Sequence, residues 1–283
     1  MLVKRSDLFL KRSAPKTILC IHDLSGMGRC SLAVAAPVLA AMGHQPVLLP
    51  TSLLSTHTGG LGHPVMQTLP AYGEPALQHY KQLGIEFDCI YSGYLATDAD
   101  QKLVHKAFEL WPEAIKIVDP VLGDHGRFYT GMEDRLPGMK ELCRAADLIL
   151  PNLTEACFLQ DLPYEDTDFS PEQAQSFADT LSGTLQKAVI TGIPMGKYLA
   201  CAGCNERDRF VLKRLRIDRN YPGTGDLFAA VLVGALLRGN ALSAATDAAA
   251  GFVSEAINNT DPAAEPALGV WFEPLLGRLC ERN

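Results

Sequence analysis

The sequence has no apolar run long enough to cross a membrane, and no segment combines a long apolar core with a small-residue cleavage site as a signal peptide does. Basic residues are also in the minority, with 25 Lys and Arg against 32 Asp and Glu, so the net charge is −7. This balance argues against nucleic acid or an anionic membrane as the main partner. We therefore expect no nucleic-acid partner and no membrane partner.

Cysteine gives little indication of metal or disulfide chemistry. The eight cysteines are scattered, and several stand in apolar runs where a thiol packs as a small hydrophobic group. Cys201-Ala-Gly-Cys204 is the single C-x-x-C pair, and no second pair follows at metal-finger spacing. We interpret this pair as structural and expect reduced thiols in a cytoplasmic protein.

Internal repeats, low-complexity tracts and long polar linkers are absent as well. With 283 residues, 47% of them hydrophobic, the chain can form one large α/β domain with a sizeable core. We expect residues 1–16 to form a flexible, basic arm and residues 17–283 to form a single domain.

Strand-like and helix-like segments alternate along most of the chain. Short apolar runs predict strands at residues 17–21, 46–50, 89–91, 115–118, 147–150 and 188–191. Helices are predicted at residues 31–42, 75–83, 98–110, 171–185, 227–237, 242–257 and near 271–279. This alternation predicts a mostly parallel central sheet with helices on both faces. Residues 198–203 and 209–217 alternate like a β-hairpin instead.

Gly223-Thr224-Gly225-Asp226 stands immediately before a run of small and apolar residues. A glycine-flanked turn at the start of a helix leaves backbone N–H groups free to bind an anion such as a phosphoryl group. Asp226 beside that anion can accept a proton from a hydroxyl. On these four residues alone, a plain turn and helix cap is an equal alternative. The helix that follows is apolar on every side, which favours a buried site and phosphoryl transfer to an alcohol.

Two acidic residues stand just after predicted strands. Asp119 ends the strand at residues 115–118, where a carboxylate can hold Mg²⁺ through water or organise phosphates, although it could also be a turn acid before proline. Glu155 stands three residues after Asn152, in capping-box register. The functional interpretation makes Glu155 a second acid near the metal.

The polar segment at residues 55–60 follows the second predicted strand, and such loops bind ligands in α/β proteins. Its His57 is equally consistent with an ordinary loop histidine.

Three separated motifs, at residues 119–124, 151–156 and 222–226, resemble the signature of the ribokinase-like small-molecule kinases. Residues 55–59 and 92–95 are similar to the pyridoxal and pyridoxamine kinases of vitamin B6 salvage. The resemblance extends from about Thr17 to the last predicted helix. It implies a three-layer ribokinase-like α/β fold and a homodimer. It also implies ATP- and Mg²⁺-dependent phosphorylation of the 5′-hydroxymethyl group of pyridoxal, pyridoxamine or pyridoxine, and a monovalent cation is a further candidate.

The resemblance also implies a role for each matching residue. Asp226 would be the general base, and Gly223, Thr224 and Gly225 would form the anion hole. Asp119 and Glu155 would hold the metal. The ATP site would include Asp119, Asn152, Glu155, Thr191 and Gly192, and the pyridine pocket would include Asp23, His57, Thr58 and Tyr94. In the hairpin, Lys213, Arg214 and Arg216 are candidates for phosphate or adenine contacts.

Two observations bear on the substrate. Asp23-Leu24-Ser25-Gly26-Met27-Gly28 is similar to the start of the hydroxymethylpyrimidine kinases of thiamin synthesis, so hydroxymethylpyrimidine or its phosphate is an alternative acceptor. Some relatives carry a cysteine before the Gly-Thr-Gly-Asp turn that can engage the pyridoxal aldehyde, but Pro222 stands there in this chain. A non-catalytic vitamer-binding protein is a third hypothesis, because fold does not fix function. The intact Asp226, Asp119 and Glu155 argue against it.

Overall fold

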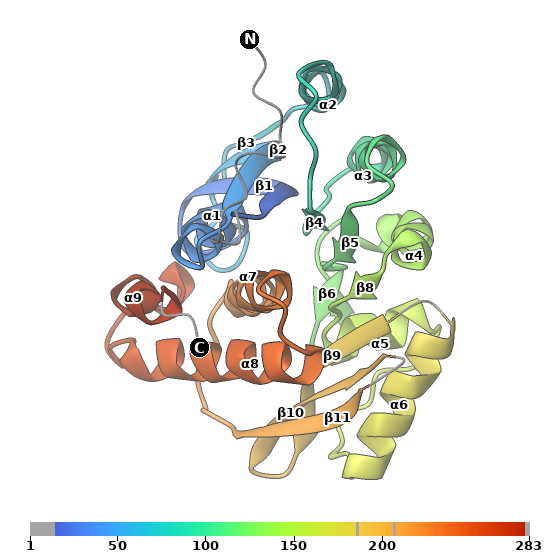
Figure 1. The fold of residues 1–283 in the computed structure, drawn as a ribbon. Helices are drawn as coiled ribbons and strands as arrows, with labels where there is room; N and C mark the ends of the chain where they lie inside the picture. Colours follow the sequence, from blue (N-terminus) through green and yellow to red (C-terminus); the bar gives the residue numbers. More distant parts are fainter. Residues whose placement is uncertain (1–14, 185–186, 206–207, 281–283) are drawn as a thin grey trace.

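The computed structural model describes residues 15–184, 187–205 and 208–280. Its centre is a nine-stranded sheet in the order β11-β10-β9-β8-β5-β4-β1-β2-β3 (Figure 1). Residues 1–14 of the predicted arm lie outside the described residues. No helix in the described part of the chain combines the length and the apolar character that a membrane span requires.

Parallel strands form the middle of the sheet, and antiparallel strands extend both edges. The parallel strands are β1 (Thr17–Met27), β2 (Gln45–Thr56), β4 (Cys89–Ser92), β5 (Ile115–Val118), β8 (Leu148–Ile149) and β9 (Lys187–Met195). The antiparallel strands are β3 (Met66–Thr68), β10 (Tyr198–Cys204) and β11 (Arg209–Leu215). A separate small hairpin joins β6 (Gly123–Asp124) to β7 (Arg127–Phe128). The predicted parallel sheet and the predicted hairpin are therefore confirmed.

Helices cover both faces of the sheet, which gives three layers (Figure 1). One face carries α1 (Leu32–Ala41), α7 (Thr224–Leu237), α8 (Leu242–Asn259) and α9 (Leu276–Leu279). The other carries α2 (Gly73–Gln82), α3 (Asp98–Leu110), α4 (Leu136–Ala145), α5 (Leu153–Leu159) and α6 (Pro171–Thr184). Short 3₁₀ turns occupy Glu133–Arg135, Pro266–Leu268 and Glu273–Leu275.

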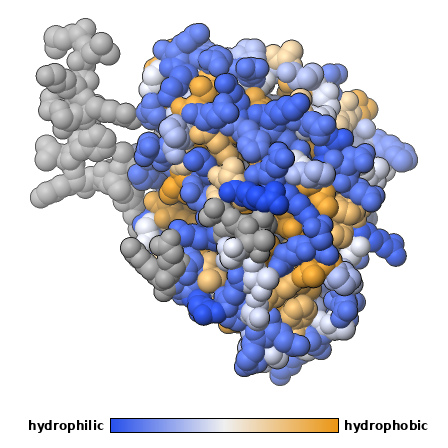
Figure 2. Space-filling model, turned by 90° about the vertical axis from the view of Figure 1, so that its right-hand side faces the viewer, coloured by the Kyte–Doolittle hydropathy of each residue, from blue (hydrophilic) through white to orange (hydrophobic). Residues whose placement is uncertain are grey.

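The sheet buries apolar side chains on both of its faces. Along β1, Ile18 and Cys20 pack into the core beneath α1 and α7, and Leu19 and Ile21 pack into the core on the other side. This alternation follows from the two-residue period of a strand. The outer surface of the layer formed by helices α2 to α6 is mostly hydrophilic, with apolar residues scattered across it (Figure 2). The apolar strand positions along β1 are therefore covered by helices on both sides.

The first two strands are longer than predicted. β1 continues through Met27 and β2 through Thr56, whereas the sequence predicted strands at residues 17–21 and 46–50. The polar residues that follow Ile21 look like a turn in the sequence, but they are buried and stay paired with β2, with a register shift between His22 and Leu24. Their polar groups find partners inside the protein, which allows the strand to continue.

Helix α7 is buried along most of its length. The residues from Leu227 to Ala235 are all buried, and α1 and α8 pack against it. This confirms the prediction of a buried helix after Asp226. The helix is therefore part of the core, and its less buried residues lie at its two ends.

Candidate active site

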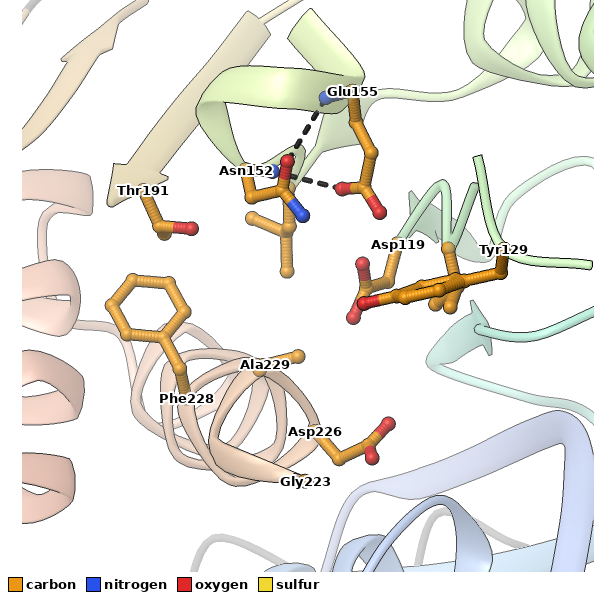
Figure 3. A pocket seen from close by; sticks show the side chains of 12 residues that line it. Asp119, Tyr129, Asn152, Glu155, Thr191, Gly223, Asp226, Phe228 and Ala229 are labelled. Atoms are coloured by element: carbon orange, nitrogen blue, oxygen red, sulfur yellow. Dashed lines mark hydrogen bonds between the residues drawn. The ribbon is translucent and has the colours of Figure 1, made fainter. Parts of the chain in front are cut away.

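A cavity of about 130 Å³ lies between the carboxyl ends of β5 and β8 and the N-terminus of α7 (Figure 3). Its lining comes from each of the three separated sequence motifs. The residues are Asp119, Val121, Tyr129, Leu150, Asn152, Glu155, Thr191, Gly223, Gly225, Asp226, Phe228 and Ala229. The position agrees with the general rule that ligands bind at the carboxyl ends of parallel strands. The structure therefore brings most of the predicted ATP-site and catalytic residues into one cavity.

The turn before α7 has the geometry of an anion site. Gly223 is the N-cap at φ 79°, and no side chain caps the helix. The Thr224 hydroxyl donates instead to the carbonyl of Tyr221, at 3.1 Å. A Cβ on Gly223 would lie 1.8 Å from the carbonyl oxygen of Arg29, so only glycine fits there. The uncapped N–H groups at this helix start can bind a phosphoryl oxygen.

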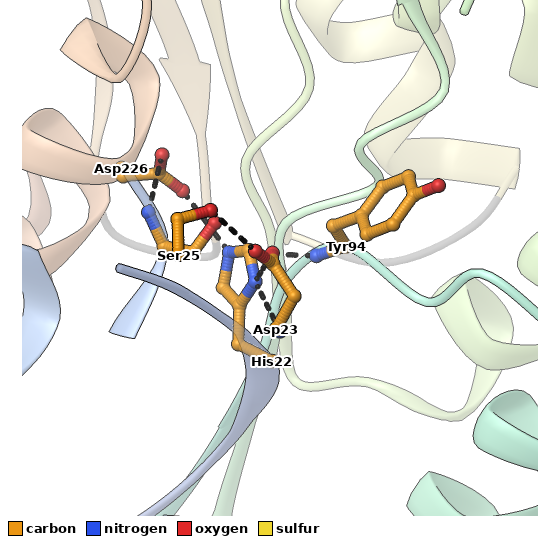
Figure 4. Close-up of polar contacts among 6 residues, drawn as sticks. His22, Asp23, Ser25, Tyr94 and Asp226 are labelled. Carbon is orange, nitrogen blue, oxygen red and sulfur yellow. Dashed lines mark hydrogen bonds and ion pairs between the residues drawn. The ribbon is translucent and has the colours of Figure 1, made fainter. Parts of the chain in front are cut away.

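Asp226 is held by two hydrogen bonds on its two oxygens (Figure 4). Oδ1 accepts a hydrogen bond from Nε2 of His22 at 3.0 Å, and Oδ2 accepts one from the backbone N–H of Ser31 at 2.8 Å. Nδ1 of His22 lies 2.8 Å from Oδ1 of Asp23. The imidazole ring therefore lies between two carboxylates.

The two carboxylates determine the charge of His22. Burial alone would lower the pKa of this histidine, but the hydrogen bonds from Asp226 and Asp23 and their negative charges raise it to about 10. Burial would raise the pKa of Asp23, but the hydrogen bond and charge of His22 outweigh it and hold that pKa below its usual value. In the imidazolium form that this raised pKa favours, both ring nitrogens of His22 donate to the carboxylates, and the backbone N–H groups of Asp23 and Tyr94 lie 2.9 and 3.4 Å from the same two nitrogens.

Asp119 and Glu155 point into the cavity from the side opposite Asp226 (Figure 3). Burial, together with the charge of Asp226, raises the pKa of Asp119 to about 7, against the opposing effect of His22. Burial and the neighbouring Asp119 also raise the pKa of Glu155 well above its usual value. No lysine or arginine is among the described residues that line the cavity. Such an arrangement of carboxyl groups favours a bound cation.

Asn152 and Glu155 form the capping box of α5 and line the cavity as well. The Asn152 side chain accepts the backbone N–H of Glu155 at 2.9 Å, and Oε2 of Glu155 accepts the backbone N–H of Asn152 at 2.9 Å. Oε1 of Glu155 accepts a further hydrogen bond from the backbone of Leu122 at 3.0 Å. The capping interpretation and the functional one therefore apply to the same residues, because the cap holds Glu155 in place.

The residues predicted for the pyridine pocket lie outside this cavity. His57 is buried, and its two nitrogens bond to the backbone of Gly59 and Ala267. Thr58 is exposed, and Tyr94 is half-buried with its backbone N–H 3.4 Å from Nε2 of His22. Asp23 is occupied by His22 and by the hydroxyl of Ser25. Their roles in binding a ring stay predictions.

The remaining candidates lie at the cavity edge, on the hairpin or in the core. Thr191 lines the cavity, while the adjacent Gly192 is exposed. On the hairpin side, Lys213 and Arg216 are exposed, and Arg214 of β11 pairs with Asp247 of α8. Cys201 is buried and Cys204 half-buried. Because they stand three positions apart on one strand, their side chains lie on opposite faces, which agrees with a structural interpretation.

Two functional features do not follow from the sequence analysis. His22 stands in a segment that looks like a turn, and the aromatic side chains of Tyr129 and Phe228 were not expected in the cavity. The available signal for His22 was its position between a buried apolar run and Asp23. A charged or polar pair that ends a buried strand in an α/β sheet faces the ligand-binding edge.

Comparison with known proteins gives consistent matches. Residues 78–270 match the family model described as phosphomethylpyrimidine kinase. The pyridoxine/pyridoxal/pyridoxamine kinase of Bordetella avium (strain 197N) is 30% identical over 247 residues, which is 79% of this chain and 78% of the relative.

Solved structures match nearly the whole chain. A Bacteroides thetaiotaomicron VPI-5482 protein, provisionally named phosphomethylpyrimidine kinase, has a TM-score of 0.91 at 32% identity and covers 97% of each chain. An orthorhombic crystal form under the same name contains pyridoxal. The pyridoxal kinase of Lactobacillus plantarum has a TM-score of 0.84 at 34% identity, with 93% of this chain and 96% of that chain covered.

Proposed function

Because the chain belongs to the phosphomethylpyrimidine kinase family, whose fold is that of the ribokinase-like kinases, we propose that it phosphorylates the 5′-hydroxymethyl group of pyridoxal, pyridoxamine or pyridoxine from Mg-ATP. The observation that carries the proposal is the convergence of Asp226, the Gly223 turn and the Asp119–Glu155 pair in one cavity. The B6 acceptor is supported by the activities named for its relatives and by the pyridoxal bound in a similar structure.

In this proposal Asp226 accepts the proton of the acceptor hydroxyl as its oxygen attacks the γ-phosphorus. The N–H groups of Gly223, Thr224 and Gly225 bind the oxygens of the phosphoryl group in transfer. Little covalent chemistry is required of the protein in phosphoryl transfer, and most of the rate comes from positioning and charge stabilisation. Thr191 and Asn152 would contact the nucleotide from the β9 and α5 side of the cavity.

The chemistry of the cavity fits a magnesium ion. Within the described residues, no three His, Cys, Asp or Glu side chains form a ready-made metal site. Mg²⁺ is typically held by one or two carboxylates, and waters and substrate phosphates complete its shell. Asp119 and Glu155 can supply those carboxylates. When bound, the ion would neutralise charge on the phosphates, which no lining Lys or Arg among the described residues does.

Replacing Asp119 by asparagine should raise the Mg²⁺ concentration for half-maximal turnover by about tenfold or more, because a carboxylate near the metal is lost. The measurement is turnover against Mg²⁺ at saturating ATP. Asp98→Asn is the matched control, since Asp98 is an acid on α3 that pairs with Arg135 at the surface. An unchanged Mg²⁺ requirement in Asp119→Asn would contradict the proposed metal site.

The acceptor itself is tested by measuring magnesium-dependent ATP consumption with pyridoxal, pyridoxamine, pyridoxine and hydroxymethylpyrimidine offered separately. We expect turnover on at least one B6 vitamer. Turnover on the pyrimidine alone would instead support the thiamin-pathway alternative, which rests on the family description and on the resemblance of residues 23–28 at the end of β1. Binding without ATP consumption would support the non-catalytic hypothesis. A homodimer, a monovalent cation and a cytoplasmic location are further parts of the proposal.

A further inference from the structure

His22 contacts the catalytic machinery directly but was not part of any predicted site. Its ring is 1% exposed, and the turn after β4 is built against it, because a Cβ on Gly93 would lie 2.0 Å from the ring. The ring of Tyr91 lies 6.3 Å away on the neighbouring strand. The imidazole is therefore fixed in position by β1, β4 and the segment that follows β4.

The contact with Asp226 completes the immobilisation of that carboxylate. One oxygen is held by Ser31 through the backbone, and the other is held by His22. Asp226 comes from α7, and both of its partners come from β1 or the segment just after it. Two hydrogen bonds from one side of the cavity fix the plane of the carboxylate, so its free lone pairs have one direction relative to the anion turn.

We propose that His22 is a positioning residue, whose ring holds Oδ1 of Asp226 and fixes the direction in which the carboxylate can accept the hydroxyl proton. This inference rests on the proposed function, because it requires Asp226 to be the general base. This role is separate from those of the anion hole and the general base, because His22 acts through Asp226 and need not contact either substrate.

His22 is enclosed by contacts from several elements. Asp23 faces it from β1, Asp226 faces it from α7, and the buried ring of Tyr91 faces it from β4. The backbone N–H groups of Asp23 and Tyr94 also point at its ring nitrogens, at 2.9 and 3.4 Å. Together these contacts leave the ring one orientation, in which Nε2 meets Oδ1 of Asp226.

Two variants test the contact that orients Asp226. His22→Ala removes it, so we expect kcat to fall about tenfold to a hundredfold while the KM for ATP changes little. His22→Gln keeps an N–H donor in the same place, so it should recover much of kcat. His44→Gln is the matched control, because His44 is also partly buried and bonds to α7, through the carbonyl of Gly234 at 2.9 Å.

A wild-type kcat in His22→Ala, or a kcat in folded His22→Gln as low as that of His22→Ala, would overturn the proposal, because the first variant lacks the donor to Asp226 and the second restores it. A separate readout is the ¹⁵N chemical shift of the His22 ring against pH. We expect the wild-type ring to stay protonated beyond about pH 8, as its pKa of about 10 requires, and the ring in Asp226→Asn to lose its proton at lower pH.

Wild-type titration near the ordinary histidine value of about 6.5 would refute the ion pair. If no acceptor were turned over, the proposed function would fail, and the ring titration would still decide whether His22 holds Asp226 as an ion pair.

Discussion

Asp226→Asn is expected to lower kcat for the B6 vitamer by about a hundredfold or more, which is the scale of general-base catalysis. The amide has nearly the same shape as the carboxylate but cannot accept the hydroxyl proton. The KM for ATP should change much less, because the anion turn, Asp119 and Glu155 remain. The measurement is steady-state turnover with saturating Mg-ATP, accompanied by the free energy of unfolding of each protein.

The control for this substitution is Asp179→Asn, which changes an acid on α6 that pairs with Arg209 far from the cavity. We expect its kcat to equal that of the wild type. The amide in Asp226→Asn places an N–H group against His22 or Ser31, so some loss of stability is expected there. Turnover that survives in folded Asp226→Asn would remove Asp226 from the role of base.

Gly223→Ala should have a comparably large effect through geometry. Gly223 sits at φ 79°, and its added Cβ would lie 1.8 Å from the carbonyl oxygen of Arg29. The turn or the segment before α1 must shift, which withdraws N–H donors from the transferred phosphoryl group. Loss of one such donor typically lowers kcat by about a hundredfold to a thousandfold. We expect a fall in kcat of that order, measured as turnover with Mg-ATP.

Gly239→Ala provides a control at the other end of the same helix. Gly239 follows α7 at φ 93°, but nothing lies within 4 Å of the added Cβ. It should therefore lose stability through backbone strain of about 1 kcal/mol and keep its kcat. An equal loss of kcat in both glycine variants would show that general destabilisation, and not the anion turn, causes the effect.

The fold and the residues that line the candidate site could be predicted largely from local patterns. The apolar runs and the helices between them define a parallel sheet, and parallel strands end at one edge. Asp119, Glu155 and Asp226 each follow a strand or begin a helix, so a single rule places all three at that edge. For this reason residues far apart in the chain can be assigned to one site from the amino-acid sequence alone.

The pairings that complete the site could not be predicted in the same way. His22 lies on β1 beside the candidate site, and its partner Asp226 is 204 positions away in the sequence. No local pattern connects the two residues. His57 is similar, because its partner is the carbonyl of Ala267, 210 positions away. Polar residues inside a strand resemble a turn until their partners are known. The length of β1 was underestimated for the same reason.

The burial of α7 has a consequence for the motions of the site. Amide hydrogens in a helix covered on all sides exchange with solvent mainly when the domain unfolds cooperatively, and not through local fraying. The first hydrogen bond of that helix joins the N–H of Leu227 to the carbonyl of Gly223, at 3.0 Å. The amide of Leu227 should therefore exchange only when the domain opens, whereas the unbonded N–H groups at residues 223–225 should exchange directly with solvent. The turn thus combines a carbonyl anchored to the core with N–H groups that face outward.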